Sequence, residues 1–182
     1  MGQFKKVDTG IEGLYIIEPK YLKDDRGYFV ELFNKKNYEE MGLKFEFAQE
    51  HQSKSKKGVL RGLHYLSKNS QAKLIRCIKG KIYDVAVDLR KNSKTYGKWY
   101  GVTLEEHDEK LFLIPKGFAH GFLALEDDNI VCYLCDEVYN PKYEGGIMWN
   151  EPKLNIQWPI EKIGIQKIIL SEKDKKWKPL EF

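Results

Sequence analysis

The chain has 182 residues, of which 42% are hydrophobic and 32% are charged, and this suits one domain with a substantial apolar core. Its net charge of +4 is small and its lysines are scattered, which argues against a nucleic-acid-binding surface but allows a pocket for an anionic ligand. Three cysteines without a disulfide pattern, no apolar leader and no membrane-length apolar run predict a cytoplasmic protein with no membrane partner.

Short alternating runs rich in β-branched and aromatic residues predict a succession of β-strands, each bounded by Gly, Asp, Asn or Pro. These runs are residues 13–19, 27–33, 73–80, 81–89, 98–104, 110–115, 121–125 and 129–139. Residues 78–89 (IKGKIYDVAVDL) are interpreted as two strands around a tight Gly-Lys turn.

Helical signals are few. Residues 35–42 (KKNYEEMG) predict a helix that ends at Gly42, and residues 171–177 (SEKDKKW) predict a short one. A doubly wound fold would need long helices between its strands, and the sequence has none. We therefore expect a mainly β chain, a sandwich or small barrel with a few short helices, in a single domain over residues 1–182.

Two histidines stand in apolar runs. In GVLRGLHYL (58–66), His64 is either a partly buried histidine with satisfied hydrogen bonds or a general base that titrates near neutral pH. In IPKGFAHGF (114–122), His120 alternates with Phe118 and Phe122, which indicates either packing or a pocket wall with one polar group. Spacing alone does not decide between these interpretations.

The segment NIVCYLCDEVY (129–139) contains a lone CxxC. In a strand, Cys132 and Cys135 would point to opposite faces, and the chain has no second cysteine pair, so a metal or redox site is disfavoured. Tyr133 is typical of strand packing, and it would share a face with Tyr139 if the strand continued that far.

Taken in order, a long set of motifs resembles one family. DDRGYFVELF, GVLRGLHY, QAKLIRCIKGKIYDVAVDLRKNSKTYGKW, LFLIPKGFAHGFLAL, CYLCDEVYNPKYEGGIMWNEP, IQWP and LSEKD follow each other as in the dTDP-4-dehydrorhamnose 3,5-epimerases. The resemblance covers about residues 16–179. It implies a cupin-type β-jelly roll, a homodimer, a dTDP-4-keto-6-deoxy sugar as substrate, no cofactor or metal, and a step in dTDP-L-rhamnose synthesis for surface polysaccharides.

The resemblance also assigns the chemistry to residues. The C4 ketone of the substrate makes the C3 and C5 protons acidic, so inversion needs a base on one ring face, a stabilised oxyanion and an acid on the other face. His64 matches the base and Asp174 the carboxylate that orients it. Tyr133 matches the proton donor, and Lys73 matches the cation near the C4 oxygen.

Other positions match family residues that hold the nucleotide and sugar. Tyr139 matches the aromatic that stacks on thymine. His51 stands where Asn is usual, and it could still donate a hydrogen bond to the ligand, although its charge would vary with pH. Arginines suit the diphosphate because a guanidinium fork fits phosphate oxygens. We expect Gly62 to interrupt the regular alternation of the strand, so that Arg61 and His64 both face one pocket. The remaining matches are Arg26, Glu31, Gln49, Arg61, His120, Glu144 and Lys173.

Three alternatives stay open. A metal-dependent cupin would need an HxH pair, and His51, His64, His107 and His120 form none. A non-catalytic sugar-nucleotide-binding module would not need a base, an opposing tyrosine and an orienting aspartate together. A 3-epimerase acting on a dTDP-4-keto-deoxysugar shares the same motifs, so the sequence does not separate one inversion from two.

Overall fold

The computed structural model describes residues 2–180, so residues 1 and 181–182 of the expected domain lie outside the described part. Its strands are β1 (Phe4–Asp8), β2 (Tyr15–Pro19), β3 (Tyr21–Asp24), β4 (Gly27–Val30), β5 (Gln49–Ser55), β6 (Leu60–Leu66), β7 (Lys73–Lys79), β8 (Lys81–Asp88), β9 (Trp99–Glu105), β10 (Leu111–Ile114), β11 (Phe118–Ala124), β12 (Asn129–Cys135) and β13 (Glu144–Gly146). The helical elements are the α-helix α1 (Lys35–Glu40) and the 3-10 helices η1 (Pro141–Tyr143) and η2 (Asp174–Lys176).

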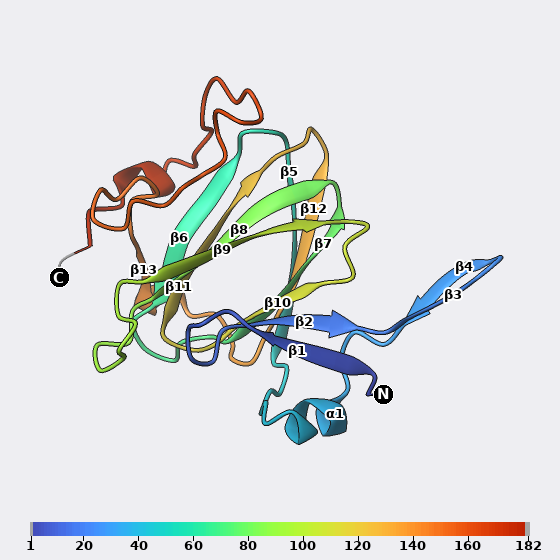
Figure 1. Ribbon diagram of the computed structural model, residues 1–182. Coiled ribbons are helices and arrows are strands. Elements are labelled where there is room, and N and C mark those ends of the chain that lie inside the picture. Colours follow the sequence, from blue (N-terminus) through green and yellow to red (C-terminus); the bar gives the residue numbers. More distant parts are fainter. Residues whose placement is uncertain (1, 181–182) are drawn as a thin grey trace.

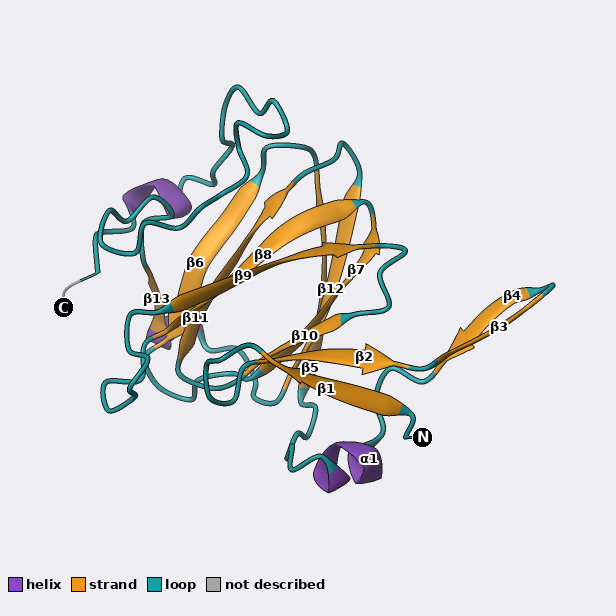
Figure 2. Ribbon diagram, in the orientation of Figure 1, coloured by secondary structure: helices purple, strands orange, loops and turns teal. Residues whose placement is uncertain are grey.

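Two antiparallel sheets face each other. One has the strand order β1-β2-β10-β7-β12-β5 and the other β13-β6-β11-β8-β9, while β3 and β4 form a separate hairpin that projects away from the sheets (Figure 1). Strands dominate and helices are short (Figure 2). The prediction of a mainly β, jelly-roll sandwich with a few short helices is therefore confirmed. No helix in residues 2–180 is long and apolar enough to cross a membrane.

The apolar core has three layers. Ile75 and Phe112 of one sheet meet Phe122 of the other in the space between the sheets. Tyr38 of α1 is fully buried against the outer face of the six-stranded sheet, and the chain after β13, which carries Trp158, covers the outer face of the other. Apolar side chains therefore fill the space between the sheets and also cover both of their outer faces.

Two local predictions are tested directly. The helix expected over residues 35–42 is confirmed as α1, and Gly42 follows it with φ +77°. Residues 78–89 do contain two strands, but β7 and β8 belong to different sheets and do not form a hairpin. The turn at Gly80 carries the chain between sheets, and a Cβ there would lie 2.6 Å from the carbonyl oxygen of Asp128.

Strands β1, β3, β5, β6 and β13 lie outside the alternating runs that the sequence predicted. The sequences of β1 and β5, FKKVD and QEHQSKS, are mostly polar, and both strands lie at the edges of the six-stranded sheet. An edge strand exposes much of its surface, so it needs fewer apolar residues than a central strand. The apolar alternation that we used to find strands is therefore weakest at these positions.

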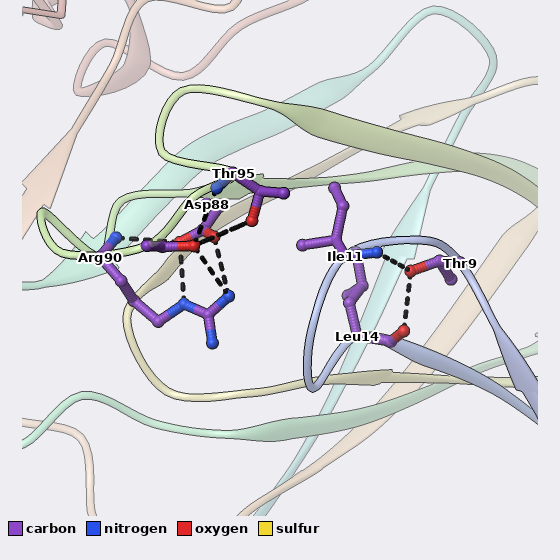
Figure 3. A network of polar contacts seen from close by, with 7 residues as sticks. Thr9, Ile11, Leu14, Asp88, Arg90 and Thr95 are labelled. Carbon is purple, nitrogen blue, oxygen red and sulfur yellow. Dashed lines mark hydrogen bonds and ion pairs between the residues drawn. The ribbon is translucent and has the colours of Figure 1, made fainter.

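A polar network closes the end of β8 (Figure 3). Asp88 is fully buried and accepts hydrogen bonds from Arg90 Nε at 2.9 Å, Arg90 Nη2 at 2.8 Å, and the hydroxyls of Ser93 and Thr95, each at 2.6 Å. Burial raises the pKa of Asp88, but these hydrogen bonds outweigh it and hold the pKa well below its usual range. The network thereby anchors the loop that connects β8 to β9.

Candidate active site

A cavity of about 680 Å³ opens between the two sheets. Strands β6 and β11 supply one wall, strands β5, β7 and β12 supply the other, and the segment around η2 completes the rim. Its polar and aromatic lining includes His51, Ser53, Arg61, His64, Tyr65, Lys73, His120, Tyr133, Tyr139, Glu144, Ser171, Lys173 and Asp174. The structure thus brings together all the predicted site residues except Arg26, Glu31 and Gln49.

His64 on β6 is paired with Asp174 of η2. The distance from His64 Nε2 to Asp174 Oδ1 is 2.6 Å, and Asp174 is only 5% exposed. Burial raises the pKa of Asp174, but its hydrogen bonds with His64, Ser171 and Trp177 outweigh burial and bring that pKa below its usual range. Because a carboxylate only accepts hydrogen bonds, His64 Nε2 is the donor in this contact, and Nδ1 is the ring nitrogen that Asp174 does not engage.

A bulge in β6 lets Arg61 and His64 share the cavity. His64 pairs with His120 of β11, while Arg61 pairs with Phe122, so three steps along β6 match two along β11. Gly62 has φ +136°, and a Cβ there would lie 2.5 Å from a backbone atom of β11. Both side chains line the cavity, which confirms the predicted role of the glycine.

The opposite wall carries Tyr133, Lys73 and His51, from β12, β7 and β5 respectively. The Lys73 ammonium lies 5.9 Å from the centre of the Tyr133 ring, and the His51 ring stacks on Tyr133 with 5.1 Å between centres. Burial raises the pKa of Tyr133 and lowers that of Lys73, and burial together with the Lys73 charge lowers the pKa of His51. Tyr133 is therefore neutral at pH 7 and has a proton to give.

A second buried pair joins β11 to β8. His120 Nε2 lies 2.8 Å from Oδ1 of Asp84 on β8, and Asp84 is fully buried with its Oδ2 unpartnered. Burial is the main cause that lowers the pKa of His120. Our sequence analysis missed Asp84, although a carboxylate inside the apolar run YDVAV (83–87) was a usable signal, because buried charges need a partner.

The rim is built from loops. Lys173 donates to Glu144 at 2.6 Å, and Tyr139 also hydrogen-bonds Glu144. Burial raises the pKa of Glu144, but these contacts outweigh it and lower the pKa. Tyr139 follows the end of β12 at Cys135, so the strand does not continue to it as the sequence suggested. Gln49 accepts a hydrogen bond from the Tyr139 backbone at 2.9 Å and stands beside the cavity lining.

Arg26 and Glu31 lie away from the cavity of their own chain. Arg26 sits at the tip of the β3–β4 hairpin, where it pairs with Asp24 and has a side chain 90% exposed. Glu31 follows β4 and accepts a hydrogen bond from Asn34 at 3.1 Å. In Figure 1 this hairpin extends outward from the sandwich, so Arg26 lies on a projecting arm and Glu31 follows the second strand of that arm.

Residues 2–180 contain no group of three or more His, Cys, Asp or Glu side chains arranged to hold a metal ion. Cys132 and Cys135 are buried and unlinked. What the cavity does offer is a histidine on one wall and a tyrosine and lysine on the other. This arrangement supports proton transfer to and from two faces of a ligand held between the sheets.

Comparison with known proteins agrees with this geometry. The profile of a family described as dTDP-4-dehydrorhamnose 3,5-epimerase matches residues 8–181. The enzyme of that name from Methanothermobacter thermautotrophicus is 51% identical over 180 residues, which are 99% of this chain and 96% of that protein.

Solved structures agree as well. The dTDP-4-dehydrorhamnose 3,5-epimerase from Elizabethkingia anophelis NUHP1 superposes with a TM-score of 0.91 at 45% identity, covering 98% of this chain and 97% of that one. A 3,5-epimerase from Legionella pneumophila Philadelphia 1, in complex with dTDP-4-keto-L-rhamnose, gives a TM-score of 0.91 at 44% identity, covering 97% and 92%. The chain therefore belongs to the dTDP-4-dehydrorhamnose 3,5-epimerase family.

Proposed function

We propose that the chain converts dTDP-4-keto-6-deoxy-D-glucose to dTDP-4-keto-L-rhamnose by inverting C3 and C5, as a step in dTDP-L-rhamnose synthesis. The observation that carries this proposal is the placement of His64 and Tyr133 on opposite walls of one cavity. Inversion requires a proton to leave one face of the ring and return to the other. Two acid-base groups on a single wall would return the proton to the face that it left.

Each catalytic group has a defined task. His64 Nδ1 removes the proton next to the C4 ketone, and Asp174 stabilises the imidazolium that forms. The electrons move into the carbonyl to give an enolate, whose oxygen is stabilised by the Lys73 ammonium. Tyr133 then donates its proton to the same carbon from the opposite face, and the carbonyl re-forms. The imidazolium of His64 then loses its proton to solvent and the phenolate of Tyr133 regains one from solvent, so both groups are restored and no redox partner is needed.

The remaining lining residues bind the nucleotide. Arg61 is held by Ser55 at 3.0 Å and by the Lys54 carbonyl at 3.0 Å, which leaves it preorganised toward the cavity for a diphosphate. Tyr139 is 38% exposed at the rim and offers a ring face for thymine. His120, His51 and the Glu144–Lys173 pair then contact the sugar and phosphates.

We further propose a homodimer in which the β3–β4 arm of one subunit reaches the cavity of the other. Leu22, Tyr28 and Phe29 on the arm are 49%, 64% and 69% exposed, which is unusual for large apolar side chains near one another. Arg26 and Glu31 lie on or beside this arm and cannot serve their own chain's cavity. A second copy supplies an occupant for both the apolar surface and the charged residues.

The unlinked cysteines support a cytoplasmic location.

The decisive experiment follows hydrogen exchange at the sugar. The protein is incubated with dTDP-4-keto-6-deoxyglucose in deuterium oxide and the sugar protons are observed by NMR. Deuterium at both C3 and C5, with a coupled 4-reductase yielding dTDP-L-rhamnose, supports the proposal, and His64→Ala should abolish both. Deuterium at C3 alone would replace the proposal with a 3-epimerase, and no exchange at either carbon would reject epimerase activity.

A further inference from the structure

Trp177 contacts both members of the His64–Asp174 pair. Its indole Nε1 donates to Oδ1 of Asp174 at 3.1 Å, and this is the same oxygen that lies 2.6 Å from His64 Nε2. The indole also meets the His64 ring edge to face, with 6.2 Å between ring centres and 69° between planes. One carboxylate oxygen is therefore held between two N–H donors that come from different parts of the fold.

The indole occupies a space that exists because residue 146 is glycine. Gly146 on β13 pairs directly with His64 on β6. A Cβ at Gly146 would lie 2.3 Å from both Cδ2 and Cε2 of Trp177, so any side chain there would displace the ring. Because Gly146 has no side chain, the Trp177 indole can approach β6 closely enough to reach Asp174.

The backbone fixes the indole from both sides. Trp177 directly follows η2, which carries Asp174, and the next residue, Lys178, bridges to Ile147. The Met148 backbone N–H also donates to the Lys178 carbonyl at 3.1 Å. The Trp177 backbone is therefore held between η2 and the segment after β13, which fixes the point from which the indole extends toward the carboxylate.

We infer that Trp177 is a positioning residue for the His64–Asp174 pair, and that Gly146 is required to seat it. This inference rests on the proposed function, in which His64 is the base. The indole N–H helps keep Asp174 ionised and aimed at His64 Nε2, and its apolar ring shields the pair from water. Both effects act on the His64–Asp174 pair and not directly on the substrate, since Trp177 is not among the residues that line the cavity.

The test replaces Trp177 by Phe, which keeps an aromatic ring but removes the N–H. We expect kcat for deuterium incorporation to fall about tenfold, as for the loss of one hydrogen bond to a charged group, with KM changed less than twofold. The acidic limb of the kcat profile should move to higher pH, because Asp174 then accepts one hydrogen bond fewer and holds the imidazolium proton more strongly, so the base is lost at a higher pH. A purely structural tryptophan would not shift that limb.

Trp99→Phe is the matched control. Trp99 donates its indole N–H to the Leu154 carbonyl at 2.8 Å, away from the cavity, so this variant loses an equivalent bond without touching the pair. It should keep the wild-type pH profile. If Trp177→Phe has the same kcat and pH profile as Trp99→Phe while His64→Ala is inactive, the inference is wrong and the proposed function stands. If His64→Ala retains exchange, the proposed base itself is wrong.

Gly146 gives an independent check. Gly146→Ala should reproduce the kcat loss and the pH shift of Trp177→Phe, because the new methyl group pushes the indole off the carboxylate. In a Trp177→Ala background the space is vacant, so Gly146→Ala should add no further loss of kcat. Additive losses would show that Gly146 acts by a route other than Trp177 and would overturn that part of the inference.

Discussion

His64 and Asp174 are separated by 110 positions in the chain, yet Nε2 of one lies 2.6 Å from Oδ1 of the other. Asp174 is 5% exposed, so its charge acts on the imidazole with little screening by water. The pair couples strand β6 to the short helix η2 near the end of the chain. Substitutions in this pair therefore test the proton-transfer steps of the proposed mechanism.

Asp174→Asn should lower kcat for deuterium exchange on the order of 100-fold or more, because an amide cannot stabilise the imidazolium as a carboxylate does. The residues are nearly isosteric, so binding of dTDP should change little. Asp127→Asn, at an exposed position, is the control and should retain wild-type kcat. Wild-type exchange by Asp174→Asn would show that the Asp174 carboxylate has no part in the mechanism.

Tyr133→Phe should separate exchange from inversion. His64 and Lys73 can still form the enolate, but no proton is delivered to the opposite face. We expect deuterium to enter C3 or C5 of recovered substrate with the original configuration, and little L-sugar to form. NMR coupling constants distinguish the two configurations. Normal L-sugar formation by the variant would mean that another group is the acid.

The lowered pKa of Lys73 predicts that activity falls at high pH. Burial lowers its pKa, so the ammonium loses its proton at a lower pH than the usual value of about 10.4, and enolate stabilisation is lost as pH rises through that pKa. Arginine keeps its charge, so the residual activity of Lys73→Arg should extend to higher pH than that of the wild type. Lys73→Met should lower kcat by roughly 100-fold. Coinciding alkaline limbs for wild type and Lys73→Arg would contradict this assignment.

The arm exchange can be tested by mixing variants. If Arg26 serves the partner's cavity, a heterodimer of Arg26→Ala with His64→Ala chains contains one site with both residues intact. Co-refolded mixtures should then regain exchange activity that neither variant has alone. If Arg26 acted on its own chain's cavity, every heterodimer site would lack one group and the mixture would stay as inactive as its components.

The Asp88 network predicts a pH-dependent stability. The folded-state pKa of Asp88 is depressed. The contribution of this carboxylate to the free energy of unfolding is therefore fully present above the unfolded-state pKa of about 3.9, and it is lost as pH falls from there toward the folded-state pKa. At pH 7, Asp88→Asn should lower the free energy of unfolding by roughly 1–3 kcal/mol, measured in urea. At pH 3 the gap between variant and wild type should shrink. A gap that is equal at both pH values would show that the carboxylate charge is not the cause.

Local patterns were sufficient for several features of this chain. The helix over residues 35–42, the alternating central strands and the mainly β class follow from side-chain size, branching and glycine placement, which act over a few residues. The need for Gly62 between Arg61 and His64 also followed from strand alternation, because three steps along a strand normally reverse the face. The order of the motifs was enough to identify the family.

Long-range contacts decided the rest. Asp84 meets His120, and Asp174 meets His64, only because separate strands and η2 converge at one end of the sandwich. Strand periodicity sets which face a side chain takes, but not which sheet the strand joins, so β7 and β8 were expected as neighbours and are not. The outward direction of the arm that carries Arg26 likewise depends on how β3 and β4 pair with each other rather than with either sheet. These features arise from packing between distant segments, which no local pattern contains.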